Sequence, residues 1–233
     1  EQISSIIESQ EKLTPEITFA LNNAKTLVEL EDIYRPFKPK RTTRGSIARA
    51  KGLEPLALVL MEQRKEYQPT IEEIAAEYIN AELEVESAEQ ALAGACDIIA
   101  EMVSDNAEYR KSVRAQTFEH GLLNVCNAKD EDSVYAQYYE YSEPLKKIPG
   151  HRILAINRGE KEEFLKVSVE VDASILLNYL FNSIIENIKS PAARYVTEAI
   201  SDSYDRLIAP SIERELRSDL FDNACEGAIR LFS

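Results

Sequence analysis

The chain has 233 residues, of which 44% are hydrophobic and 29% charged, and its 41 acidic and 27 basic side chains give a net charge of −14. This apolar content is typical of a globular chain and excludes wholesale disorder. The length allows one large domain or two small ones. The charge argues against a wholly basic nucleic-acid-binding surface and against binding to anionic membranes, but it is compatible with a local basic patch.

Two features favour the cytoplasm. No run of about 18 apolar residues could cross a bilayer, and the first residues lack the basic and apolar regions of a signal peptide. Three scattered cysteines, Cys96, Cys126 and Cys225, are too few for a disulfide scaffold, so we expect buried thiols in a reducing compartment. No initiator methionine is present, so we also expect a processed chain or a piece of a longer one.

The charge is concentrated in two neighbouring segments. Residues 35–51 contain no acid and carry +7, which leaves −21 for the rest of the chain. The basic strip, as we call its charged residues, consists of Arg35, Lys38, Lys40, Arg41, Arg44, Arg49 and Lys51. Residues 52–108, the acidic segment, hold 14 acids and two bases. Either the strip pairs with the acidic segment inside the fold, or it contacts phosphate or another protein.

Most of the chain is predicted to be helical from threonine, serine and aspartate caps, from prolines at first-turn positions and from apolar spacing. The expected helices cover 15–34 with a break at Asn22-Asn23, 44–50, 55–61, 71–83, 88–103, 106–120 with Asp105 as the cap, 192–208 and 210–232. Prolines at positions 36 and 39 leave an extended basic segment at 37–41.

The strand signal is confined to two segments. Apolar and polar residues alternate from Leu165 to Val171. Because a lone strand cannot satisfy its backbone, we expect Leu122–Cys126 to pair with it. The predicted fold class is therefore mainly α, multi-helical, with a small β-ribbon.

Residues 43–61 have the outline of a helix-turn-helix, with two short predicted helices around Lys51-Gly52-Leu53. A second helix that reads DNA exposes polar side chains, whereas here residues 56–61 are all apolar. We therefore expect a helix-turn-helix-like part with a buried second helix that does not read bases. Contact of the basic first helix with phosphate or protein stays open.

No pattern in the sequence indicates catalysis. The seven glycines form no phosphate-binding loop, and neither His-Glu-x-x-His nor Cys-x-x-Cys occurs. The two histidines, His120 and His151, are 31 positions apart, and a zinc site would need other ligands as well. We expect no enzyme activity, no cofactor, no metal and no small-molecule substrate.

Two further clusters lie in the middle of the chain. Four tyrosines, at 135, 138, 139 and 141, are flanked by acids that repel phosphate, which favours packing or a protein contact over base stacking. A secondary basic region consists of Lys146, Lys147, His151, Arg152 and Arg158, with Lys161 close behind. It either touches nucleic acid or balances the acids.

Three long segments resemble the bacterial Tex family of transcription accessory proteins. They are residues 30–57, which begin Leu-Glu-Asp-Ile-Tyr-Arg-Pro-Phe-Lys-Pro, residues 141–160, which begin Tyr-Ser-Glu-Pro-Leu-Lys-Lys-Ile-Pro-Gly, and residues 202–217, which begin Asp-Ser-Tyr-Asp-Arg-Leu-Ile-Ala-Pro. The usual pattern has serine where Gly150 stands and leucine where Ala209 stands.

The resemblance implies a large cytoplasmic protein similar to a eukaryotic transcription elongation factor. In this family a helical N-terminal region precedes RNase H-like, helix-hairpin-helix and OB-fold RNA-binding domains, so the chain would be the N-terminal piece. The resemblance carries over no catalytic residue. The implied partners are nucleic acid (RNA or DNA), bound through the full-length protein, and the transcription machinery.

We expect a discontinuous layout, with residues 1–70 and 172–233 as a helical scaffold and residues 71–171 as an inserted helical module with a β wing. Two functions stay open. The chain is either a scaffold and interaction module that is non-catalytic by itself, or a direct binder of RNA or DNA backbone through the basic strip.

Overall fold

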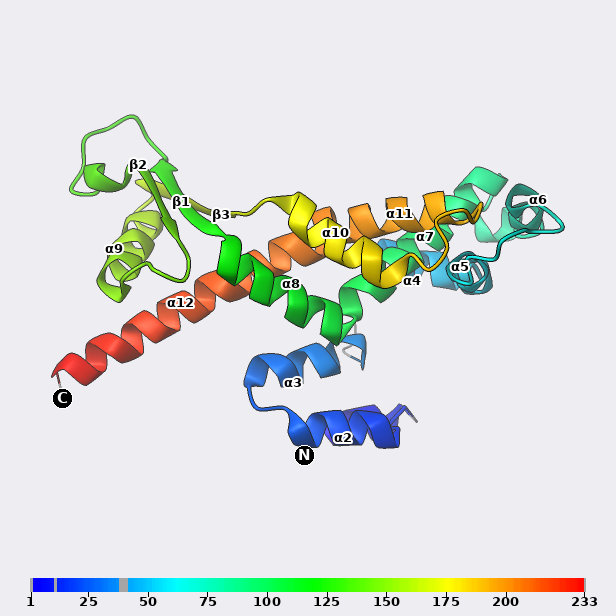
Figure 1. Cartoon of the computed structure of the whole chain (residues 1–233), viewed down its shortest axis with the longest axis horizontal. Helices are drawn as coiled ribbons and strands as arrows, with labels where there is room; N and C mark the ends of the chain where they lie inside the picture. The colour runs from blue at the N-terminus through cyan, green and yellow to red at the C-terminus, as the bar shows by residue number, and fades with distance from the viewer. Residues whose placement is uncertain (1, 11, 38–41, 233) are drawn as a thin grey trace. The chain divides into compact units, whose positions relative to one another are not determined.

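A computed structural model describes residues 2–10, 12–37 and 42–232. It is mainly α with a small antiparallel sheet, which confirms the predicted class (Figure 1). The helices are α1 (Gln2–Ser9), α2 (Pro15–Asn23), α3 (Leu27–Tyr34), α4 (Arg44–Ala50), α5 (Glu54–Met61), α6 (Ile71–Ala76), α7 (Ala88–Asp105), α8 (Ala107–His120), α9 (Gly150–Lys161), α10 (Ala173–Ile184), α11 (Ala193–Asp202) and α12 (Ala209–Phe232). The strands are β1 (Leu122–Asn127), β2 (Glu140–Pro144) and β3 (Leu165–Glu170).

Local capping chemistry sets five of the helix starts, as predicted. The hydroxyls of Thr14, Thr26 and Ser87 each accept a hydrogen bond from the backbone N–H three residues on, at 3.2–3.3 Å. Thr43 and Thr70 form full capping boxes, in which the side chain three residues on also accepts from the backbone N–H of the cap. These five positions fix where the helices begin before any tertiary contact is made.

The helix predicted over 71–83 was wrong at its C-terminal end, because α6 stops at Ala76. The side chain of Asn80 accepts a hydrogen bond from the backbone N–H of Glu82 at 2.9 Å and caps a single 3₁₀ turn. Asparagine competes in this way with helical hydrogen bonds. Glu84 then takes a left-handed conformation with φ of 54°, which ends the turn.

Two more predicted boundaries were wrong. Asp105 is the last residue of α7, and Asn106 caps α8 instead by accepting from the backbone N–H of Tyr109 at 3.1 Å. The helix expected over 192–208 changes at Ser203 into a π-helical segment that runs directly into α12. The buried Ser203 hydroxyl donates to the backbone carbonyl of Ala100 on α7 at 2.7 Å, so a tertiary contact accompanies the change in helical pitch.

Among the α-helices and strands of the described residues, α1, α9, α10 and β2 were not predicted from the sequence. The strand β2 has the sequence Glu-Tyr-Ser-Glu-Pro, which carries little strand signal on its own. It forms because β1 lies beside it, with Val125 opposite Tyr141. The predicted pairing of β1 with β3 is confirmed, with Leu123 opposite Val169. The sheet order is β2-β1-β3.

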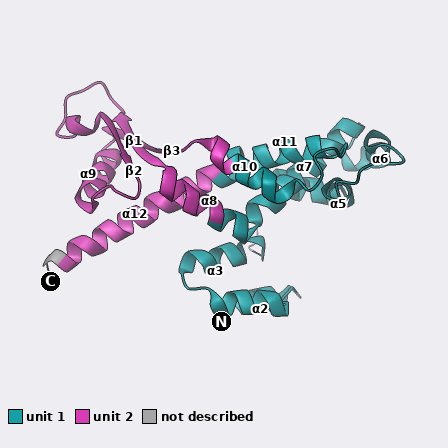
Figure 2. Cartoon of the chain, viewed as in Figure 1, with its two compact units in different colours: residues 1–111, 177–208 teal, residues 112–176, 209–233 magenta. Residues whose placement is uncertain are grey.

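The chain divides into two compact units (Figure 2). Unit 1 comprises residues 1–111 and 177–208, and unit 2 comprises residues 112–176 and 209–233. These boundaries differ from those expected at 70/71 and 171/172. The expected domains stay a prediction, because a division by contacts does not establish which parts fold independently. Among the described residues, no helix is long and apolar enough to cross a membrane.

Unit 1 is built around α7, against which α4, α5, α6 and α11 pack. Two glycines let α7 approach its neighbours closely. A Cβ on Gly45 of α4 would lie 2.4 Å from the side chain of Glu101, and a Cβ on Gly94 of α7 would lie 2.4 Å from that of Leu53. A side chain at position 45 or 94 would therefore require the side chain of Glu101 or Leu53 to move.

A buried ion pair in unit 1 joins α3 to the first turns of α8. Nε of Arg110 donates to Oδ1 of Asp32 at 2.8 Å, and the two side chains are 0% and 7% exposed. Placing two charges out of water is costly, and only a close partner of opposite charge offsets that cost. The pair therefore fixes α3 to α8 in a single arrangement.

We expect Asp32→Asn to lower the free energy of unfolding by about 3–5 kcal/mol in urea denaturation, because the buried Arg110 guanidinium would lose the carboxylate that accepts its hydrogen bond at 2.8 Å. The control is Glu29→Gln, which removes the charge from an exposed pair with Lys111 between the same two helices. It should have a much smaller effect. Equal losses in the two variants would contradict this role of Asp32.

Unit 2 places α9 and α12 against the sheet, and α12 covers the free edge of β3. The backbone N–H of Val169 donates to the carboxylate of Glu213 at 3.0 Å, and the carbonyl of Val167 accepts from the guanidinium of Arg217 at 3.3 Å. An uncovered edge strand offers these same groups to another strand. Side chains of α12 therefore block strand addition at β3.

Candidate functional site

Three described members of the basic strip pair with the acidic segment inside unit 1. The ion pairs are Arg35–Asp105 (3.6 Å), Arg49–Glu101 (2.7 Å), Arg49–Glu54 (3.3 Å) and Lys51–Glu84 (3.6 Å). All four acids belong to residues 52–108. Of the two alternatives left open by the sequence, internal pairing therefore accounts for these three cations. Their contact with nucleic acid or a partner stays a prediction.

The pair between Arg49 and Glu101 is the most buried of these contacts. The Glu101 side chain is 5% exposed and the Arg49 side chain 32%. Arg49 lies on α4 four residues after Gly45, so the two share one face of the helix. Because Gly45 has no side chain, there is room beside it for the Glu101 carboxyl. The same carboxylate of α7 thus pairs with Arg49 and packs against Gly45.

Arg44 differs from these members of the strip. Its side chain is exposed and lines two cavities of unit 1, of about 450 Å³ and 350 Å³. Within the described part of the chain, no hydrogen bond or ion pair holds its guanidinium. The remaining predicted contacts, Lys38, Lys40 and Arg41, lie outside the described residues. Arg44 is therefore the described strip residue that is available to an anion.

The larger of these cavities has acidic walls and contains Cys96 and Asp97. Burial raises the pKa of the Asp97 carboxyl, although Arg206, at 3.6 Å, and Arg44 act in the opposite direction. Burial also raises the pKa of the Cys96 thiol to about 12, and the nearby carboxylates, Glu198 first among them, add to this shift. A thiol with such a pKa is protonated at neutral pH and is a poor nucleophile.

The raised pKa predicts an order of thiol reactivity. At pH 8 the thiolate of Cys96 amounts to about one part in ten thousand, so its alkylation by iodoacetamide should be slow. The expectation of three buried thiols was wrong, because Cys96 and Cys225 are half-buried and Cys126 is exposed. Cys126 should therefore react first. Peptide mass spectrometry after timed quenching measures both rates in one sample. Alkylation of Cys96 as fast as that of Cys126 would show that the thiol is not held protonated.

Most residues of the secondary basic region also form ion pairs with acids of unit 2. Lys146 pairs with Glu119, and Arg158 pairs with Glu162 at 2.9 Å. Arg152 pairs with Glu143 at 3.0 Å, and its guanidinium lies 5.8 Å from the centre of the Tyr141 ring. Lys147 and His151 are exposed. Balancing of local acids thus accounts for three of the five residues, and contact of this region with nucleic acid stays a prediction.

The tyrosine cluster packs inside unit 2. Tyr135 and Tyr138 are buried, and the rings of Tyr138 and Tyr141 meet edge to face at 5.4 Å. The Tyr135 hydroxyl donates to the carboxylate of Glu162 at 2.8 Å. Burial and this hydrogen bond raise the pKa of Tyr135. The packing role favoured by the acidic flanks is confirmed for the two buried tyrosines.

Residues 43–61, for which we expected a helix-turn-helix-like part, contain α4 and α5, and the motif itself stays a prediction. Leu56, Ala57 and Leu60 of α5 are buried, which confirms the expectation that this helix faces the core, while Leu58 is 52% exposed. No described residues form a group of three or more His, Cys, Asp or Glu that could hold a metal ion.

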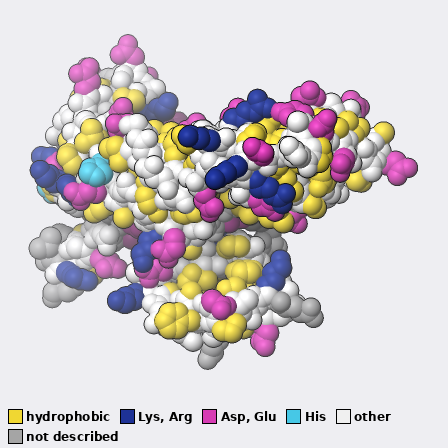
Figure 3. Space-filling view, turned by 45° about the vertical axis from the view of Figure 1, so that its right-hand side comes forward, with side chains coloured by type: hydrophobic (Ala, Val, Ile, Leu, Met, Phe, Trp, Pro, Cys, Tyr) yellow, Lys and Arg dark blue, Asp and Glu magenta, His cyan; other side chains and the backbone are white. Residues whose placement is uncertain are grey.

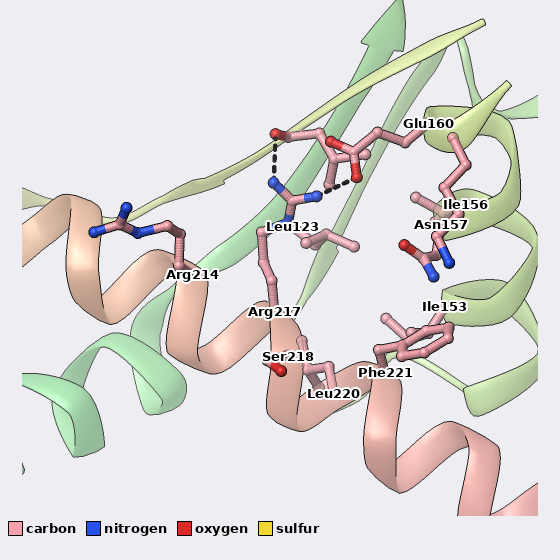
Figure 4. Close-up of a pocket in the computed structure, with 12 residues that line it drawn as sticks. Leu123, Ile153, Ile156, Asn157, Glu160, Arg214, Arg217, Ser218, Leu220 and Phe221 are labelled. Carbon is pink, nitrogen blue, oxygen red and sulfur yellow. Dashed lines mark hydrogen bonds and ion pairs between the residues drawn. The ribbon is translucent and has the colours of Figure 1, made fainter. Parts of the chain in front are cut away.

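A groove in unit 2 was not predicted from the sequence. Its volume is about 400 Å³, and its walls come from α9, α12 and the sheet (Figure 4). Ile153 and Ile156 of α9 form its floor with Leu123 of β1, and Phe221 closes one side from α12. The spacing of Ile153, Ile156 and Glu160 is helical and could have indicated α9, but no sequence signal pairs α9 with α12.

These features define a mainly α chain whose charged segments are used largely for internal contacts. The family model described as Tex central region-like matches residues 66–232. The chain therefore belongs to the Tex family, which confirms the resemblance seen in three of its segments.

Individual relatives agree with this assignment. The chain is 43% identical to the protein YdcI of Bacillus subtilis over all of its own length and 33% of that protein. It is 33% identical to Protein tex of Bordetella pertussis, with 97% of the chain and 30% of that protein aligned. It is 27% identical to the human S1 RNA-binding domain-containing protein 1, with 97% and 24% aligned. The chain thus spans a third or less of the length of these relatives.

Proposed function

We propose that this chain is a helical scaffold and interaction module of a cytoplasmic, nucleic-acid-associated transcription accessory protein, and that it is non-catalytic by itself. Relatives named as a transcriptional accessory protein and as an S1 RNA-binding domain-containing protein support the nucleic-acid association of the whole protein. In this proposal RNA or DNA is bound through the full-length protein, and the module contacts protein partners such as the transcription machinery.

The observation that carries the proposal is the internal pairing of the basic strip. Each phosphate contact requires a Lys or Arg side chain that is free to replace a counterion on the nucleic acid. Arg35, Arg49 and Lys51 already face carboxylates of unit 1. On the face shown in Figure 3, basic side chains lie among acidic ones and form no unbroken field. Such a surface favours protein contacts over strong general binding of nucleic acid.

One observation favours the second candidate function, direct binding of nucleic-acid backbone by the strip. Arg44 is exposed and held by no ion pair to a described residue. Lys40 and Arg41 precede it closely in the sequence. Three neighbouring cations would supply a small phosphate-binding patch, and a weak, salt-sensitive affinity would follow.

A salt-dependent binding assay separates the two functions. We expect the chain to show no saturable binding of a 20-nucleotide single strand or duplex below about 100 µM protein at 50 mM salt. Direct binding would instead give a falling plot of log K against log salt. Its slope would drop by about two to three units in the Lys40→Ala, Arg41→Ala, Arg44→Ala triple variant.

The matched control removes three cations of unit 1 outside the strip, through Arg64→Ala, Lys65→Ala and Lys189→Ala. These residues are exposed, so the variant lowers the net charge equally without touching the strip. A slope that the strip variant loses and the control keeps would establish the second function and overturn the first. Any turnover of substrate by the purified chain would contradict the non-catalytic role.

A further inference from the structure

The groove of unit 2 combines a buried apolar floor with an open, cationic rim. Its floor side chains, including Leu123 and Ile156, are at most 6% exposed. Leu220 and Phe221 of α12 are half-buried and form the side of the cavity. A volume of about 400 Å³ is within the range of cavities that bury a ligand's apolar groups. The groove therefore offers apolar contact that the described chain does not itself fill.

Two cations stand at its rim without carboxylate partners among the described residues. Arg214 is exposed and extends from α12 at one end of the cavity (Figure 4). Lys161 lies at the end of α9, with its ammonium group 5.3 Å from the centre of the Phe221 ring. Within the groove, Glu160 is paired with Arg217 (Figure 4). The lining thus has a positive excess, although the whole chain carries −14.

We propose that this groove binds an amphipathic acidic segment of a partner protein. The apolar side chains of the segment would fill the cavity between α9 and α12, and its carboxylates would face Arg214 and Lys161. The proposal rests on the proposed role of the chain as an interaction module, and it assigns that role a place and a partner chemistry. A segment that presents apolar anchors at helical spacing matches a groove between two helices.

The chemistry of the groove favours a protein segment over nucleic acid. Single-stranded nucleic acid is bound by open aromatic platforms beside a continuous row of cations. The floor here is aliphatic, and the ring of Phe221 already lies against the ammonium group of Lys161.

The groove also excludes an added strand. The N–H of Val169 and the carbonyl of Val167 on the outer edge of β3 are held by Glu213 and Arg217. Because these backbone groups already have partners, the occupant must be recognised by its side chains. Apolar anchors and flanking carboxylates are the side chains that this lining complements.

The experiment selects ligands from a phage-displayed library of random 16-residue peptides with the folded chain as bait. We expect enriched peptides that carry a net negative charge and at least two large apolar residues within one helical turn. For the three most enriched synthetic peptides, we expect Arg214→Glu to weaken binding about tenfold in fluorescence anisotropy. Phe221→Ala should weaken binding by a similar factor through the lost apolar contact.

The matched control is Arg230→Glu, which makes the same charge change at an exposed position of α12 outside the groove. It should change the affinity less than twofold, and circular dichroism should show that all variants are folded. No enrichment, enrichment of neutral or basic peptides, or equal effects of the two charge reversals would overturn the proposal. So would binding of a 16-nucleotide oligo(U) RNA that is lost in Arg214→Glu.

The two proposals fail on different residues. If the peptide experiment contradicts the groove proposal, the result of the nucleic-acid binding assay with the Lys40→Ala, Arg41→Ala, Arg44→Ala variant does not change. If the proposed scaffold function is wrong, nucleic-acid binding will depend on salt through the basic strip, and the variants Arg214→Glu and Phe221→Ala will bind nucleic acid as the unchanged chain does. Each result can therefore be assigned to one site.

Discussion

The arrangement of unit 1 depends on a buried carboxylate. Glu101 lies on α7, the helix against which α4, α5, α6 and α11 pack, and its side chain is 5% exposed. A buried charge needs both space and a counter-charge. Gly45 supplies the space, because a Cβ there would lie 2.4 Å from the Glu101 side chain, and Arg49 supplies the charge at 2.7 Å. One turn of α4 thus meets both needs.

This constraint changes the meaning of the charge pattern. Read as composition, a segment of +7 beside a segment with 14 acids leaves two interpretations open, namely internal pairing and contact with phosphate or another protein. In the structure, Arg35 and Arg49 pair with the α7 acids Asp105 and Glu101, and Lys51 pairs with Glu84 just before α7. The first segment that resembles the Tex family therefore has a structural role in most of its described cations. Arg44 and Arg214, which form no ion pair with a described residue, lie far apart in the sequence.

The parts of the fold that the sequence predicted are those governed by local chemistry. A threonine at position 43 or 70 caps a helix through atoms within four residues, so its effect can be read directly. The pairing of β1 with β3 was expected because the apolar alternation indicates a strand at 165–171 and a lone strand needs a partner. In contrast, β2 needs β1 beside it, and the groove needs α9 and α12 to meet across about 60 residues of sequence. The sequence shows where the basic residues of the strip lie, but it does not show which distant acid each of them pairs with.

A double-mutant cycle on Arg49 and Glu101 tests the internal pairing most directly. We expect Arg49→Ala to destabilise the chain by about 2 kcal/mol in urea denaturation while Glu101 is present, because the buried carboxylate would lose the guanidinium that lies 2.7 Å from it. In the Glu101→Gln background the same change should cost much less, which gives a coupling energy of about 1–2 kcal/mol. Additive losses within about 0.5 kcal/mol would contradict the pairing as the constraint that organises unit 1.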